Sequence, residues 1–309
     1  MDRLDATRIF LAVADAGSLT AGAGRLGLPL ATVSRKLAAL EDHLGARLLA
    51  RTTRRVVLTE AGRGYLEAGR RILTDLDAAE RAVHGITDIP RGRLGITAPY
   101  VFGRLHILPV VTQFLAAHPE VDVRLLLLDR VVDLLDEGLD LAVRIGPIAD
   151  GAMVATSLGA IGRVVCASPA YLAAHGTPMQ PADLEGHACV AFSAAAVVDR
   201  WVFPGKDARH EMAVAIRTRL VVSTAEAAID AAEAGLGIVR VLSYQAAAAL
   251  AAGRLRRILA AFEPPPEPVS LAWPQGRLLP AKVRAFVDFA APRLRRALAG
   301  EGVSGRAGE

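Results

Sequence analysis

Residues 18–58 read SLTAGAGRLGLPLATVSRKLAALEDHLGARLLARTTRRVVL, and this stretch decides how the N-terminal part of the chain folds. Its central segment has apolar residues at helical spacing, which predicts a helix with one stripe facing a core. That stripe consists of Val33, Leu37, Leu40 and Leu44. The opposite face is small and polar and consists of Ala31, Arg35, Ala38 and Asp42, flanked by Thr32 and Ser34. Such a face suits the DNA major groove, because small side chains permit close approach and Arg can bond guanine through two hydrogen bonds.

A second short helix is predicted just before this one. Ser18 is a suitable N-cap, the helix would end near Leu26, and Gly27 would turn the chain. Two helices joined across a short turn that contains Gly are typical of a helix-turn-helix. The same pattern also fits a small helical bundle whose charged face is only solvated, because surface helices commonly carry Arg and Lys.

Basic residues gather after these helices. Arg47, Arg51, Arg54 and Arg55 surround Thr52 and Thr53, and residues 56–58 are strand-like. A hairpin tip of this composition beside a helix-turn-helix predicts a wing that contacts phosphates or the minor groove. Residues 1–60 carry nine basic and six acidic side chains, so most of the net charge of +4 lies in the first fifth of the chain. We expect DNA contacts from Ser18, Leu30, Ala31, Thr32, Ser34, Arg35, Arg51, Thr52, Arg54 and Arg55.

The same segment contains a match to a dinucleotide-binding fingerprint. Residues 22–27 read GAGRLG, and Glu41 and Asp42 lie near the spacing of a ribose-binding acid. The fingerprint requires its first glycine directly at the end of a strand. Here residues 14–21 intervene and include a helix cap, so two glycines within a short helix are the favoured interpretation.

Composition indicates a globular chain. Of its residues, 52% are hydrophobic and 22% are charged, as in globular proteins. The length of 309 residues is enough for two or three domains. The N-terminus has no apolar run of the signal-peptide type, and the longest stretch without charges, residues 164–182, is interrupted by prolines. We therefore expect a cytoplasmic protein that does not enter a membrane.

The sequence offers no pattern typical of an enzyme. The seven histidines lack metal-ligand spacing, and neither a G-x-S-x-G elbow nor a phosphate-binding P-loop motif is present. Cys166 and Cys189 lie in strand-like runs, so they are predicted to be core residues. We expect no catalytic residue, no metal and no cofactor.

A long helix is predicted after the wing. Thr59 is its expected N-cap, and a heptad can be written to about Asp88. Its a positions are Gly62, Gly69, Leu76 and Val83, and its d positions are Tyr65, Ile72, Ala79 and Ile86. This repeat predicts a dimer through paired helices, although a second stripe of Leu66 and Leu73 could instead pack on the first helix of its own domain. The segment PRG at 90–92 marks a domain boundary.

From residue 93 the pattern changes to alternating strands and helices. Strands are expected at 94–98, 121–128 and 141–145, with helices at 102–117 and 131–137, which predicts a parallel sheet. A second unit follows, with strands at 164–167, 189–192, 220–222 and 238–242, a hairpin between Trp201 and Val214, and a helix at 224–234. A strand at 269–272 and a helix at 281–298 are expected to close the fold.

The chain resembles LysR-type transcriptional regulators along nearly its full length. The stretches that carry the resemblance are RIFLAVADAGSLTAGAGRLG, TVSRKLAALEDHLGARLLARTTRRVVLTEAG, PRGRLGITAP, DLLDEGLDLAVRIGP, CASPAYLAAHGTP, AGLGIVRVLSYQ and LLPAKVRAFVDF. The resemblance implies an α/β protein with an N-terminal all-α winged helix-turn-helix at 1–58, a linker and dimerisation helix at 59–90, an effector-binding regulatory domain at 91–299 and a flexible tail at 300–309. The regulatory domain would consist of two Rossmann-like lobes arranged as in periplasmic binding proteins. Lobe I would span 92–161 and 268–298, and lobe II 162–267.

The start of the recognition helix departs from the family pattern. Family members usually have Ser-Gln-Pro-Ala here, whereas this chain has Pro29-Leu30-Ala31-Thr32. Proline is acceptable at this point of a helix, but a side-chain amide able to read adenine is missing. We therefore expect the docking mode to be preserved and the operator sequence to differ.

A small-molecule site is expected where strands end, because ligands of open α/β sheets bind outside the carboxyl ends of the strands. The candidates are Thr97, Ala98, Pro99, Tyr100, Phe102, Asp129, Arg144, Gly146, Ser193, Ser223 and Thr224. Ser223 with Glu226 reads as a capping box, and helix capping or turn chemistry is the alternative role for these residues. Arg144 would suit a carboxylate-bearing effector, or it could pair with Asp140 or Asp129.

The predicted domains and the family resemblance together give the expected partners. They are double-stranded DNA with two-fold related half-sites, an unidentified effector, a second copy of the chain in a dimer or tetramer, and RNA polymerase. A solute-binding receptor is the alternative, because the two lobes alone would suggest it, and a dinucleotide-binding enzyme is a weaker one. The N-terminal helix-turn-helix argues against the receptor.

Overall fold

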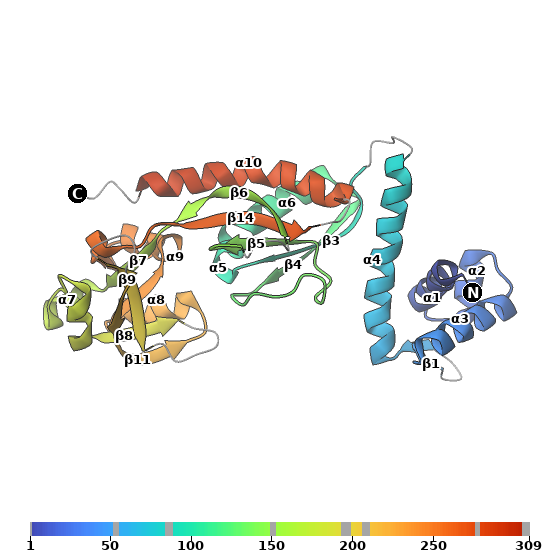
Figure 1. Ribbon diagram of the computed structural model, residues 1–309, viewed down its shortest axis with the longest axis horizontal. Helices are drawn as coiled ribbons and strands as arrows, with labels where there is room; N and C mark the ends of the chain where they lie inside the picture. The colour runs from blue at the N-terminus through green and yellow to red at the C-terminus, as the bar shows by residue number, and fades with distance from the viewer. Residues whose placement is uncertain are drawn as a thin grey trace. The chain divides into compact units, whose positions relative to one another are not determined.

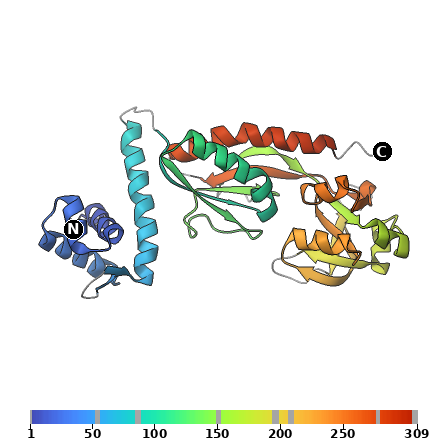
Figure 2. The ribbon, with the colours of Figure 1, turned by 180° about the vertical axis from the view of Figure 1, so that it is seen from behind.

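The computed structural model describes residues 2–51, 56–83, 89–148, 153–192, 199–205, 211–275 and 279–304 (Figures 1 and 2). The chain divides into two compact units: Met1–Ile89, and Pro90–Glu309 apart from the short stretch Leu278–Ala281. The two units are therefore described separately below.

In its described residues the first unit contains four helices, and the last three correspond to the helices predicted above. They are α1 (Arg3–Ala16), α2 (Leu19–Leu26), α3 (Leu30–Leu44) and α4 (Glu60–Val83), with strands β1 (Leu49–Arg51) and β2 (Val56–Leu58) before α4. Ser18 caps α2 by accepting a hydrogen bond from the N–H of Ala21, and Gly27 ends α2 in the left-handed conformation. The two strands pair antiparallel, as a wing requires. Residues 52–55 at the wing tip lie outside the described residues.

The core of this unit confirms most of the predicted apolar stripe. Val33, Leu37 and Leu40 of α3 are at most 1% exposed and pack against α1. Leu44 is 39% exposed, so its assignment to the stripe was wrong. It is the last residue of α3, where Gly45 already turns the chain away from the core.

The fingerprint-like glycines lie inside α2, and residues 9–13 before them belong to helix α1. Gly22 is buried against α1: a Cβ atom built on it would lie 2.8 Å from Cα of Val13. Glycine is therefore required at this position by close helix packing, which accounts for it without a nucleotide. This placement contradicts the dinucleotide alternative, because the fingerprint must follow a strand.

The heptad proposed for α4 is only partly correct. Tyr65 donates to or accepts from Thr7 through the two hydroxyl oxygens, 2.8 Å apart, and packs edge-on against Phe10. Gly69 is buried against Thr7, so the first heptad positions face the helix bundle of their own unit. Leu66 and Leu73 also pack on this core, as the alternative predicted, whereas Ile72 is 51% exposed.

The second unit begins with a mixed sheet in the order β4-β3-β5-β14-β6. Its strands are β3 (Gly92–Ala98), β4 (Val121–Leu127), β5 (Leu141–Ile145), β6 (Met153–Ile161) and β14 (Glu267–Pro274). Strand β3 is parallel to β4 and β5, whereas β14 is antiparallel to β5 and β6. The helical segments of this lobe are α5 (Tyr100–Phe102), the π-helix η1 (Gly103–Ile107), α6 (Leu108–Ala117) and α10 (Ala281–Ser304). Phe114 of α6 packs edge-on against Phe286 and Phe289 of α10.

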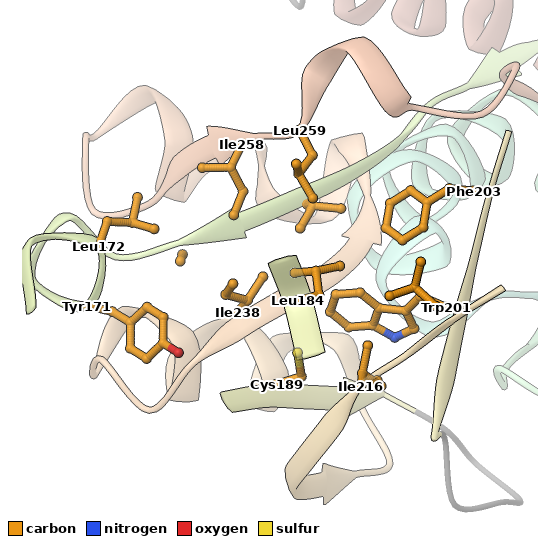
Figure 3. Packing of buried hydrophobic residues seen from close by; sticks show 13 residues of the cluster. Tyr171, Leu172, Leu184, Cys189, Trp201, Phe203, Ile216, Ile238, Ile258 and Leu259 are labelled. Carbon is orange, nitrogen blue, oxygen red and sulfur yellow. The ribbon is translucent and has the colours of Figure 1, made fainter. Parts of the chain in front are cut away.

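A further sheet forms the other lobe, in the order β11-β8-β12-β7-β13. Its strands are β7 (Arg163–Ala167), β8 (Ala188–Phe192), β11 (Arg217–Val222), β12 (Ile238–Leu242) and β13 (Arg256–Ile258), and β9 (Arg200–Pro204) and β10 (Glu211–Ala215) form the predicted hairpin. The helical segments are α7 (Pro169–His175), η2 (Pro181–Gly186), α8 (Ala225–Glu233), α9 (Ser243–Ala251) and η3 (Ala260–Phe262). A buried cluster joins this sheet to the hairpin, with Trp201 and Phe203 of β9 at the same end of it (Figure 3).

Two predictions for this unit are corrected by the structure. Residues 131–133 are irregular and residues 134–138 form turns, so the predicted helix is absent. The Asp133 carboxylate caps this single turn by accepting hydrogen bonds from the N–H groups of Leu135 and Asp136, and Gly138 ends it with a φ of 64°. The last helix continues past residue 299 to Ser304, and residues 305–309 lie outside the described part of the chain.

The helical stretch Tyr100–Ala117 has the length and apolar composition of a membrane-spanning helix. Phe102, Ile107 and Phe114 within it are fully buried in the core of the unit. This burial accounts for its apolar composition without a membrane, as is common for core helices.

Candidate functional site

Helix α3 presents the face predicted to read DNA. Leu30, Ala31 and Arg35 are exposed, and Thr32 and Ser34 are half-buried beside them. Pro29 precedes the first turn, so this end of the helix has no side-chain cap to block an approaching surface. The arrangement offers a small apolar and hydroxyl surface together with the exposed guanidinium of Arg35, which can bond base edges or phosphates.

A buried carboxylate connects α3 to the wing. Glu41 is 3% exposed, and its Oε1 accepts hydrogen bonds from the N–H groups of Leu48 and Leu49 at 2.8 and 3.1 Å. Its Oε2 accepts from Arg47 at 2.9 Å. Glu41 therefore fixes the start of β1 to the last turn of α3, which is a structural role and not that of a ribose-binding acid.

The wing is also fixed from its other strand. The N–H of Val56 donates to the carbonyl of Gly17, and the Thr59 hydroxyl bonds the carbonyl of Arg47 or Leu48 while capping α4 at the N–H of Gly62. A Cβ on Gly62 would lie 2.0 Å from the carbonyl oxygen of Leu48, so this contact requires glycine. Of the predicted wing contacts, Arg51 ends β1, whereas Thr52, Arg54 and Arg55 lie outside the described residues.

In the second unit, the end of β3 forms the lobe I side of the candidate effector site. Thr97, Ala98 and Phe102 are at most 2% exposed, so they form the layer beneath the surface. Tyr100 is 41% exposed, and its N–H donates to Oδ1 of Asp129 at 3.0 Å. Asp129 thereby caps the helix that follows Pro99, which joins the ends of β3 and β4.

An ion pair connects the two lobes at this point. Nη2 of Arg104 in η1 lies 2.8 Å from Oε1 of Glu226 in α8. Burial raises the pKa of Asp129, and the nearby Glu226 raises it further, whereas the N–H of Tyr100 opposes the shift. The carboxylates of Asp129 and Glu226 therefore lie close to the guanidinium of Arg104, at a place where a charged ligand could bind.

The cap of α8 differs from the prediction. Thr224, and not Ser223, is the N-cap, because its hydroxyl accepts a hydrogen bond from the N–H of Ala227. The predicted capping box is therefore wrong: Glu226 reaches across to Arg104, and Ser223 is left exposed.

The remaining predicted residues are distributed as follows. Nη2 of Arg144 donates to the carbonyl of Val132 at 2.9 Å, so neither of the two predicted acid partners holds it. Burial lowers the pKa of Arg144. Gly146 follows β5 with a φ of 103°, a conformation that favours glycine, and Ser193 lies outside the described residues.

Several residues at the lobe junction were not predicted. Tyr244 packs edge-on against Phe102 with ring centroids 5.5 Å apart, and Arg163 donates two hydrogen bonds to Glu267 where the chain crosses between the lobes. Arg104 could have been found, because it lies one helical turn after Tyr100. The pairing of Arg163 with Glu267 spans 104 positions and leaves no local signal.

The two cysteines are core residues, as predicted. Cys166 and Cys189 are fully buried, and burial raises the pKa of each thiol to about 12. Thiols of this kind are protonated at neutral pH and are poor nucleophiles.

Comparison with known families assigns both units. Residues 4–63 match the family model of the bacterial regulatory helix-turn-helix protein, lysR family, and residues 87–295 match the LysR substrate binding domain. The chain belongs to the LysR family of bacterial transcriptional regulators. It is a transcriptional regulator with a helix-turn-helix DNA-binding domain and a two-lobed effector-binding domain, as its sequence predicted.

Individual LysR-family proteins resemble the chain over most of its length. An HTH-type transcriptional regulator of Xanthomonas campestris pv. campestris is 38% identical over 94% of this chain and 85% of the relative. Among solved structures, CrgA, a LysR-type transcriptional regulator from Neisseria meningitidis, is 28% identical, with a TM-score of 0.59 over 94% of this chain and 98% of CrgA. The Vibrio cholerae virulence activator AphB is 26% identical, with a TM-score of 0.58 over 93% and 98%.

Proposed function

We propose that this LysR-family regulator reads its operator through α3 and holds the DNA backbone with its wing, while a small molecule between the lobes sets its activity. The observation that carries the first part is the exposed α3 face with Arg35, held against the wing by the buried Glu41. In this arrangement Arg35, aided by Thr32 and Ser34, contacts base edges or adjacent phosphates. The predicted wing residues Arg51, Thr52, Arg54 and Arg55 contact the DNA backbone, and Ser18, Leu30 and Ala31 line the approach.

The proposed effector site uses the lobe junction. Tyr100, Asp129 and Thr224 lie around the ion pair of Arg104 with Glu226, so a ligand there contacts both lobes. A ligand that binds one lobe angle more tightly shifts the population toward it, and only this difference in affinity can change activity. The DNA-binding face lies in the other unit, so effector and operator do not compete for the same residues. We assign the chain no enzymatic role and place it in the cytoplasm, where the DNA is.

Self-association is part of the proposal. Two recognition helices read half-sites related by a two-fold axis, which requires at least a dimer. We assign it to the exposed Ile72 and to the predicted heptad positions that follow it in the sequence, because the first heptad positions are used within the unit. We expect a dimer or tetramer, with RNA polymerase as a further partner at the promoter. Light scattering of the full-length protein at micromolar concentration tests this, and a monomer would contradict it.

Replacing Arg35 by Ala is expected to weaken operator binding by about 1–3 kcal/mol if Arg35 contacts a base. The physical reason is the loss of paired hydrogen bonds to a base edge, which cannot be replaced by water at the same geometry. Fluorescence anisotropy with the DNA upstream of the protein's own gene, compared with random DNA, measures the change. Arg256→Ala is the matched control, because Arg256 is exposed on β13 of the other unit. If Arg35→Ala binds both DNAs as the parent does, the assignment of α3 as recognition helix is wrong.

A further inference from the structure

An arginine on the central strand of the lobe II sheet has contacts that would suit ligand binding. Arg240 lies on β12, and its guanidinium carbon is 4.8 Å from the ring centroid of Phe203 on β9. A guanidinium held against a ring by a cation–π contact can still donate hydrogen bonds from its N–H groups to a ligand. Phe203 belongs to the buried cluster and is 2% exposed, so this platform is rigid (Figure 3).

The surroundings of Arg240 place it at the junction of the lobes. Arg163, the first residue of β7, donates to Oε1 of Glu267 through Nε at 3.1 Å and Nη2 at 2.7 Å. Glu267 begins β14, and its Oε2 lies 3.6 Å from the Cβ position of Gly146, just beyond the carboxyl end of β5. Arg240 interacts electrostatically with both Arg163 and Glu267. Arg163, Arg240 and Glu267 therefore lie where the chain passes between the lobes, at the starts of β7 and β14, and near the end of strand β5 of lobe I.

Of the two arginines here, Arg163 is paired with Glu267, and Arg240 is the one available to bind a ligand. Within the part of the chain that the structure describes, its guanidinium has no hydrogen-bonded acceptor, although it is only partly exposed. The pKa of Arg240 is lowered to about 10, mainly by burial and also by the nearby Arg163, whereas Glu267 opposes the shift. Two guanidinium groups and one carboxylate leave a net charge of +1, which one bound negative charge would neutralise.

We propose that Arg240 binds the carboxylate of an organic monocarboxylate effector, with the body of the effector extending into the junction between the lobes. The inference rests on the proposed function, because it names the ligand class of that regulatory site. A planar guanidinium bonds a carboxylate through two parallel hydrogen bonds, and a single negative charge matches the local charge better than a phosphate dianion beside Glu267. Arg144, the residue predicted for this role, is a weaker candidate because it already donates to the carbonyl of Val132.

Paired probes of equal shape and different charge test the proposal on the full-length protein. Butyrate and benzoate are compared with butyramide and benzamide, and inorganic phosphate is a separate arm. Thermal shift and calorimetric titration are measured for the parent, Arg240→Gln and Arg240→Lys. Arg217→Gln is the matched control, because Arg217 is exposed at the start of β11 in the same lobe.

We expect one or both carboxylates at millimolar concentration to raise the melting temperature of the parent and of Arg217→Gln, and their amides to have no effect. Arg240→Gln should lose roughly tenfold to a hundredfold in carboxylate affinity, which corresponds to the loss of a charge-assisted hydrogen-bonded pair. Arg240→Lys keeps the charge but not the planar pair of donors, so a smaller loss is expected, and this variant also serves if Arg240→Gln does not fold.

Three results would overturn the proposal: no carboxylate protection of the parent, equal protection of the parent and both Arg240 variants, or equal protection by the amides. Protection by phosphate alone would identify an inorganic anion site and would also overturn it. Operator binding is measured on the same samples. If operator binding equals that of the parent while carboxylate binding is absent, the DNA-binding role is supported and only the effector assignment is wrong.

Discussion

Replacing Lys282 by Ala is expected to lower the free energy of unfolding of the effector-binding unit by about 3–5 kcal/mol. Lys282 lies in the first turn of α10 and is 8% exposed; its Nζ donates to the carbonyl of Arg93 and lies 3.0 Å from Oδ2 of Asp140. The same carboxylate oxygen accepts from the N–H of Gly95 at 2.8 Å. Removing the ammonium leaves Asp140 charged and poorly solvated, and that uncompensated charge accounts for most of the expected cost.

Chemical unfolding of Lys282→Ala followed by circular dichroism measures this change. Arg284→Ala is the matched control, because Arg284 lies two residues later on α10 and is exposed; we expect a change below about 0.5 kcal/mol for it. Adding Asp140→Asn to Lys282→Ala should recover part of the loss, since the buried charge is then removed. A loss of less than 1 kcal/mol for Lys282→Ala, or no recovery in the double variant, would contradict a role for this pair in holding α10 to β3.

The elements that the sequence predicted correctly have local signals. Ser18 and Gly27 bracket α2, the alternation of strands and helices marks the two lobes, and Pro90 separates the units. Each of these signals depends on backbone chemistry within a few residues, such as a capping hydroxyl or a glycine with positive φ. The family resemblance then extended these local predictions to the arrangement of the lobes.

The errors arise where tertiary contacts override a local pattern. The heptad predicted for α4 includes Gly62 and Gly69, but the wing and α1 approach them closely, and this intrachain packing requires small residues there. Ser223 and Thr224 are equally good caps by composition, and only the start of α8 distinguishes them.

The sequence predicted which strand ends form the candidate site, but it did not predict the ion pair or the arginine available to bind a ligand there. Strand ends located Tyr100, Asp129 and Thr224, because parallel strands end at one edge of a sheet. The ion pair of Arg104 with Glu226 joins residues 122 positions apart, which a single sequence cannot reveal. Arg240 was overlooked for the same reason: its strand reads as an apolar core strand, and the Phe203 ring beneath it comes from a distant hairpin.

Replacing Glu41 by Ala is expected to destabilise the N-terminal unit by about 3 kcal/mol and to abolish operator binding. The buried N–H groups of Leu48 and Leu49 would lose their shared acceptor, and Arg47 would lose its partner. An unpaired buried donor costs more than the hydrogen bond contributed, because it cannot bond water instead. DNA binding suffers in addition, since β1 is then no longer fixed to α3 and the wing and recognition helix cannot meet one operator together.

Two companion variants separate these effects. Glu41→Gln keeps one acceptor oxygen at the same place, so it should retain the bonds to the two N–H groups, lose the ion pair with Arg47, and be less destabilised than Glu41→Ala. Glu67→Ala removes an exposed carboxylate from α4 of the same unit and should leave stability within about 0.5 kcal/mol of the parent. Calorimetry and operator anisotropy on the full-length protein measure both effects. Should Glu41→Ala melt and bind DNA like Glu67→Ala, the wing is held by β2 and Thr59 alone, and the buried carboxylate does not organise the DNA-binding surface.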